Sequence, residues 1–117
     1  MYNELRNLNT ILSSNTGYVY ILYNTESNLV KIGSTQNPHE RLSKLTNESG
    51  TKLKYYITQP MYIFQLVEKV MLQKYDRFRV KGEWLKGVEF DRVVNQLKEI
   101  CDSEDFKRRN ISKDIKQ

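Results

Sequence analysis

Two short runs rich in β-branched and aromatic residues constrain the fold of this chain more than any other feature. They span Gly17–Leu22 and Val30–Thr35, and a polar stretch over 24–28 separates them. Side chains of these types favour pleated strands, and the polar stretch is typical of a hairpin connection. The pattern therefore predicts two paired strands, over residues 17–23 and 29–34.

A helix signal follows the second run at once. Asn37 can cap a helix with its side chain, and Pro38 suits the first helical position. Glu40 stands three residues after the cap, where it would complete a capping box by bonding the backbone amide of Asn37. We expect the helix to run to about Thr46.

The rest of the chain predicts one more strand and two more helices. Residues 52–58 carry strand-forming side chains, and apolar residues recur at helical spacing over 61–75 and again from Phe90 to Cys101. The order is strand, strand, helix, strand, helix, helix. We predict an α/β fold of the α+β type, with a small three-stranded antiparallel sheet flanked by helices.

The length of 117 residues indicates a single domain. We place it at 17–104, after an N-terminal arm or short helix over 1–16. A basic C-terminal tail over 105–117 has few apolar residues to bury, so we expect it to be frayed or disordered.

Composition excludes several classes of protein. No apolar run approaches the roughly 20 residues that cross a bilayer, and the N-terminus does not resemble a secretory signal. We therefore expect a soluble intracellular protein, in the cytoplasm or a host-cell interior, with the nucleus as the alternative for a eukaryotic virus. Cys101 and His39 are the single cysteine and histidine, which excludes a disulfide and a Cys/His zinc site. Any metal would have oxygen ligands.

The net charge of +5 and the pI of about 9.3 favour a polyanionic partner. Nucleic acid is the partner that we expect, with DNA ahead of RNA, and we expect no membrane partner. Oligomeric state stays open. The asparagine- and lysine-rich composition fits an AT-rich phage, virus or bacterium.

A candidate site emerges from the predicted sheet and helices. Residues two apart in a strand point to one face, so Tyr18 and Tyr20 share a side of the sheet. Phosphodiester hydrolysis needs a base, a cation at the developing charge and stabilisation of the leaving oxygen. Tyr20, Lys31, Arg41 and Glu68 could supply these functions, and Glu68 is a suitable ligand for Mg²⁺.

The ordered motifs GYVYIL, VKIGST and NPHERL, followed by a helical glutamate, resemble the GIY-YIG nuclease superfamily. The resemblance extends from Gly17 to Leu85. It is greatest to the small phage and viral branch, whose second motif is KIG and which ends in GEW(F/L).

The resemblance implies a metal-dependent endonuclease. It makes Tyr20 the base for the attacking water, Arg41 the contact to the scissile phosphate, and Glu68 the ligand of one divalent ion, Mg²⁺ or Mn²⁺. Lys31 stands at the second tyrosine of the general motif and could bind phosphate or lower the pKa of Tyr20. The candidate nucleic-acid contacts are Tyr18, Lys31, Arg41 and Lys44.

Leu72 stands where many members of the branch carry a histidine, four residues after the glutamate. A nucleic-acid-binding module with weak or no cleavage is therefore the alternative function, and a protein-interaction domain is a third. Two of these residues also have a purely structural interpretation. Tyr20 could be a half-buried aromatic residue of a strand, and Lys31 could prevent an edge strand from pairing with another chain. Glu83 could pair with a basic residue or complete the site.

Overall fold

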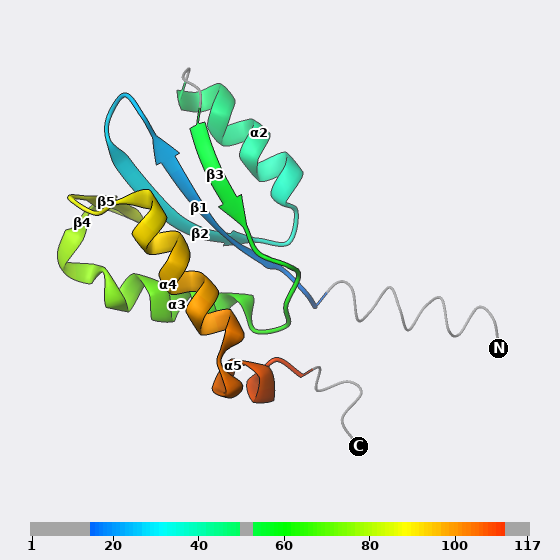
Figure 1. Ribbon diagram of the computed structural model, residues 1–117. Helices are drawn as coiled ribbons and strands as arrows, with labels where there is room; N and C mark the ends of the chain where they lie inside the picture. The colour runs from blue at the N-terminus through cyan, green and yellow to red at the C-terminus, as the bar shows by residue number, and fades with distance from the viewer. Residues whose placement is uncertain (1–14, 50–52, 112–117) are drawn as a thin grey trace, which may run out of the picture.

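The computed structural model describes residues 15–49 and 53–111, which form an α+β fold around one antiparallel sheet (Figure 1). The predicted fold class is confirmed. The sheet has five strands in the order β3-β1-β2-β5-β4. The elements are β1 (Tyr18–Asn24), β2 (Leu29–Thr35), α2 (Pro38–Ser49), β3 (Leu53–Ile57), α3 (Phe64–Lys74), η1 (Asp76–Phe78), β4 (Arg79–Lys81), β5 (Trp84–Lys86), α4 (Phe90–Asp102) and α5 (Glu104–Arg109).

The hairpin β1–β2 is the centre of the sheet. Its register runs from Tyr18 opposite Thr35 to Asn24 opposite Leu29. Asn24 closes the turn, because its side chain accepts hydrogen bonds from the backbone amides of Glu26 and Ser27 at 3.0 and 3.2 Å. Asn28 adopts a positive φ of 60°, which asparagine tolerates better than most residues.

The two faces of the sheet are covered differently. One face carries Val19, Ile21, Val30 and Ile32, which form the core with apolar residues of α3 and α4. Alternation turns Tyr20 and Leu22 to the other face. Leu22 lines a hollow there with residues of α2, a helix in which no residue is buried. The sheet therefore lies between the apolar core that it forms with α3 and α4 on one face and the polar helix α2 on the other (Figure 1).

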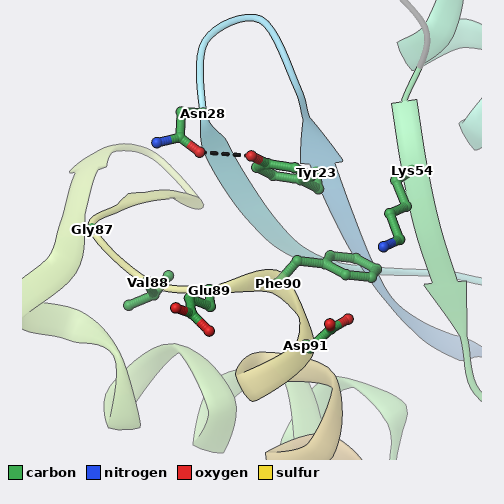
Figure 2. A pocket seen from close by; sticks show the side chains of 8 residues that line it. All are labelled: Tyr23, Asn28, Lys54, Gly87, Val88, Glu89, Phe90 and Asp91. Atoms are coloured by element: carbon green, nitrogen blue, oxygen red, sulfur yellow. Dashed lines mark hydrogen bonds between the residues drawn. The ribbon is translucent and has the colours of Figure 1, made fainter.

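Phe90 docks the start of α4 on the turn end of the sheet. Figure 2 shows its ring between Tyr23 of β1 and Lys54 of β3. The ring centroids of Tyr23 and Phe90 are 6.1 Å apart, and the Lys54 Nζ lies 5.2 Å from the Phe90 centroid. The Tyr23 hydroxyl also donates a hydrogen bond to Asn28 Oδ1 at 2.7 Å. The contacts of Phe90 tie α4 to β1 and β3.

The predicted three-stranded sheet is wrong in its strand count. Strands β4 and β5 extend the sheet beyond β2, and each has three residues. Runs this short show no alternation that a sequence pattern could register. Gly82 (φ 54°) and Gly87 (φ 87°) supply positive φ at the two ends of β5.

Helix boundaries shift modestly from the predicted ones. Helix α3 begins at Phe64 rather than at 61, because Met61 instead exchanges two backbone hydrogen bonds with Gly17, at 2.8 and 2.9 Å. Helix α2 continues to Ser49. Among the described residues, none of the helices combines the length and apolar character that crossing a bilayer requires.

The expectation of a frayed or disordered tail is wrong for its first part. Ser103 caps α5 by accepting a hydrogen bond from the amide of Phe106, and Arg109 pairs with Asp105 at 3.1 Å. Asn110 then accepts hydrogen bonds from the amides of Tyr62 and Ile63, at 2.7 and 3.4 Å. Residues 112–117 and most of the predicted arm over 1–16 lie outside the described residues, so the domain boundaries stay predictions.

Candidate active site

Tyr20 lies across Gly33, its direct partner in the β1–β2 register. A Cβ placed on Gly33 would collide with Cζ and Oη of the tyrosine. Tyr20 is only 1% exposed, so it is more deeply buried than the half-buried strand aromatic of the structural reading. Gly33 is required here because any larger residue would occupy the space of the ring.

Helix α2 brings Arg41 toward the hydroxyl of Tyr20. The Asn37 side chain caps the helix by accepting a hydrogen bond from the Glu40 amide at 3.3 Å. The Asn37 backbone amide instead donates to Thr35 Oγ1 at 3.0 Å, and the Glu40 carboxylate bonds the Asn37 side-chain amide. The predicted bond from Glu40 back to the cap's backbone is therefore wrong. The cap starts the helix directly after β2, with exposed Arg41 in its first turns.

Glu68 reaches the same region from α3. Ser34 of β2 donates its hydroxyl proton to Glu68 Oε1 at 2.5 Å. The carboxylate is half-buried. Ser34 lies directly after Gly33, the glycine that makes room for Tyr20, and it was not among the predicted site residues.

Glu83 enters from the turn between β4 and β5. Its backbone carbonyl accepts a hydrogen bond from the Ile32 amide at 3.3 Å, which fixes the turn against β2. Its Oε1 lies 3.1 Å from the Nζ of Lys31, whose side chain is 12% exposed. Lys31 also lies 5.4 Å from the centroid of Trp84. The edge-guard reading of Lys31 is wrong, since β2 lies between β1 and β5.

The two carboxyl groups share a hydrogen bond and titrate together. Burial, followed by the hydrogen bond with Glu83, raises the pKa of Glu68 to about 7. Burial also acts to raise the pKa of Glu83, but the hydrogen bonds from Glu68 and Lys31 outweigh it and lower that pKa. Below about pH 7 the pair therefore holds one proton, mainly on Glu68, and this proton is lost as the pH rises through 7.

The Tyr20 hydroxyl keeps its proton well above neutral pH. Burial raises its pKa to about 12, and the negative charges of Glu83 and Glu68 act in the same direction. The charge of Arg41 and its hydrogen bond to the tyrosine act in the opposite direction. The hydroxyl thus responds to three charged groups, which are the two carboxyl groups and Arg41.

The donor set suits a hard divalent cation. Two carboxyl groups and the Ser34 hydroxyl offer oxygen atoms, and Mg²⁺ is commonly held by one or two carboxylates with water and substrate phosphate. No group of three or more His, Cys, Asp or Glu side chains forms a metal site within 15–49 and 53–111.

Two predicted nucleic-acid contacts lie outside this cluster. Tyr18 is half-buried at the start of β1, and Lys44 is exposed on α2, one turn beyond Arg41. Leu72 packs against the core. The structure thus brings Tyr20, Lys31, Arg41 and Glu68 together and adds Gly33, Ser34 and Glu83. Gly33 and Ser34 stand in the VKIGST motif and Glu83 in the GEW motif, but only Glu83 had been considered as a site residue.

Comparison with known proteins places most of the chain in one family. The model of the T5orf172 domain matches residues 17–103. A search of curated proteins and a search of solved structures each found no match. The family match does not itself identify the GIY-YIG superfamily, so that finer resemblance stays a prediction. By the extent of the match, the chain belongs to the T5orf172 domain family.

Proposed function

We propose that this protein is a metal-dependent endonuclease that hydrolyses phosphodiester bonds in DNA by attack of water. The observation that carries the proposal is the convergence of Tyr20, Arg41 and the hydrogen-bonded pair Glu68 and Glu83. These residues come from a strand, two helices and a turn. Water attack on a phosphodiester requires a base and positive charge at the phosphate, which a tyrosine, an exposed guanidinium and a metal held by paired carboxyl groups could supply.

Arg41 is the proposed phosphate clamp. Its side chain is exposed, so a phosphate can approach it, and its guanidinium can bond two phosphate oxygens at once. Lys31 is engaged by Glu83 at 3.1 Å. We therefore propose that Lys31 positions Glu83, and that it contacts a phosphate only after the ion pair with Glu83 opens.

Glu68 and Glu83 are the proposed metal ligands. A bound Mg²⁺ or Mn²⁺ would supply positive charge for the leaving oxygen of the scissile bond. The two carboxyl groups must both ionise to bind it. The positive charge of the bound cation would offset the two carboxylates, so they would no longer oppose the loss of the Tyr20 proton.

Tyr20 is the proposed base, assisted by Arg41. A tyrosine with a pKa of about 12 accepts a water proton only after its own proton leaves. Arg41 favours that loss through its charge and its hydrogen bond. The proposal therefore expects cleavage to accelerate as the pH rises above neutrality.

A nucleic-acid-binding module with little cleavage is the second candidate. The high pKa of Tyr20 and the apolar packing of Leu72 favour it. Membership of the T5orf172 family supports a nuclease-like or nucleic-acid-binding role and does not separate the two.

Nicking of supercoiled plasmid in Mg²⁺ or Mn²⁺ tests the proposal. Wild type is compared with Glu68→Ala and Arg41→Ala, and with the matched surface controls Glu99→Ala on α4 and Arg108→Ala on α5. Metal-dependent nicking that is lost in both site variants and kept in both controls supports the endonuclease. Equal trace nicking in all five proteins, with intact salt-sensitive DNA binding, establishes the binding module instead. Absence of DNA binding refutes both.

A further inference from the structure

A hollow lined by cationic side chains lies at the C-terminal end of α3. It has a volume of about 510 Å³ and lies between the end of α3, η1 and the first turns of α4. Figure 1 shows α3 running toward the sheet edge where β4 begins. The charged side chains of its lining are Lys74, Arg77, Arg92 and Glu89, and Gln96 adds an amide.

The three cations of this hollow outnumber its single carboxylate, Glu89, and none of them forms an ion pair within the described part of the chain. No carboxylate there lies within 4.0 Å of Lys74, Arg77 or Arg92, whereas Arg79 nearby pairs with Asp76 at 2.8 Å. Arg77 stacks on Phe78, with 4.9 Å between its guanidinium carbon and the ring centroid. Cations gathered around one hollow repel each other, and an anion in the hollow would relieve that repulsion.

We infer that this hollow binds a backbone phosphate of the nucleic acid on which the candidate active site acts, an inference that rests on the proposed function. A phosphate oxygen can accept hydrogen bonds from the two guanidinium groups and the ammonium group. The Gln96 amide offers a further donor. The site reads no base and supplies affinity and position.

Exposed cations connect the hollow to the active site. From Arg77 the chain continues through Arg79 and Lys81 of β4, a strand whose three residues are all exposed, and reaches Glu83 in the next turn. Val80 between these cations is 57% exposed, and the β4–β5 pairing shifts register between Arg79 and Lys81. A strand with alternate cations and no buried residue suits contact with a polyanion.

The spacing fits one nucleic-acid strand. Glu68 and Lys74 are six residues apart on α3, which corresponds to about 9 Å along the helix axis. A DNA strand advances about 3.4 Å per nucleotide along the duplex axis. For a DNA strand lying parallel to α3, the hollow would thus take a phosphate roughly two or three nucleotides from the scissile bond.

The test measures how DNA affinity depends on salt. Binding of the full chain to a labelled duplex is followed by fluorescence anisotropy between 50 and 200 mM salt for wild type, Lys74→Gln and Arg92→Gln. Lys107→Gln, on the exposed side of α5, is the matched control. Each lost phosphate contact flattens the plot of log affinity against log salt by about 0.9. We expect this flattening in both hollow variants and not in the control. The nicking rate at saturating DNA should be the same in all four proteins.

The outcomes separate this inference from the proposed function. If wild type binds DNA and both hollow variants keep the wild-type salt slope, the hollow is not a phosphate site for DNA. A thermal shift with inorganic phosphate supplies the second arm. If phosphate stabilises wild type and not the variants while the DNA slopes stay equal, the ligand is a free phosphate and the assignment to nucleic acid is overturned. If wild type binds no DNA at all, both the phosphate site and the proposed function are refuted.

Discussion

Replacing Glu68 by glutamine should change how the stability of the protein depends on pH. In the folded protein the pKa of Glu68 is raised from 4.5 to about 7, mainly by burial and by its hydrogen bond with Glu83. Between these two values the folded state keeps a proton that the unfolded state releases. The free energy of unfolding therefore falls as pH rises through this window. Glutamine carries an NH₂ donor at all pH values and removes this dependence.

The shift sets the size of the effect. One pKa unit corresponds to about 1.36 kcal/mol, so the full shift gives a ceiling of about 3 kcal/mol, which screening of the half-exposed carboxyl reduces to about 1–2 kcal/mol. The lowered pKa of Glu83 acts in the opposite direction, but its contribution is lost only as pH falls below 4.5. The range from pH 5 to pH 8 thus reports on Glu68.

Urea unfolding at several pH values, without divalent metal, measures this directly. The free energy of unfolding of Glu68→Gln minus that of wild type should rise by about 1–2 kcal/mol from pH 5 to pH 8. Glu99→Gln, which removes an exposed carboxylate from α4, should leave the difference constant. Parallel pH profiles for wild type and Glu68→Gln would refute the carboxyl pair, since they would place no shared proton in this part of the site.

Three further substitutions test the local geometry by thermal or urea unfolding. Gly33→Ala should cost about 1–3 kcal/mol and abolish any nicking, because its methyl group displaces the Tyr20 ring; an equal cost in a Tyr20→Ala background would contradict the contact. Asn37→Ala should cost about 1 kcal/mol by uncapping α2, whereas no change would show that water replaces the cap. Asn110→Ala should cost about 1–2 kcal/mol by leaving the amides of Tyr62 and Ile63 without their acceptor, and an unchanged midpoint would contradict this.

The long periodic elements of the fold could be predicted, because each one carries its own signal. The β-branched and aromatic content of 17–23 and the helical spacing of 90–101 match β1 and α4 within one residue at each end. Strands β4 and β5 could not be predicted, since three residues contain too little pattern. Their strand character comes from pairing with β2 and with each other.

The neighbours within the site could be predicted only in part. Motif order was enough to select Tyr20, Arg41 and Glu68 as candidates. The pairing of Lys31 with Glu83 spans 52 positions, and it depends on β5 lying beside β2, which no local pattern reveals. The burial that raises the pKa of Tyr20 likewise depends on the β1–β2 register over Gly33.

The ion pair between Lys31 and Glu83 has a consequence for synthesis on the ribosome. The β1–β2 hairpin and α2 emerge early, and they already hold Tyr20 and Arg41. Glu83 emerges more than fifty residues after Lys31, and the turn that carries it must then dock on β2 before both carboxyl groups are in place. A nascent or truncated chain that ends before this turn lacks the second carboxyl group. Completion of the site is thereby coupled to completion of the sheet.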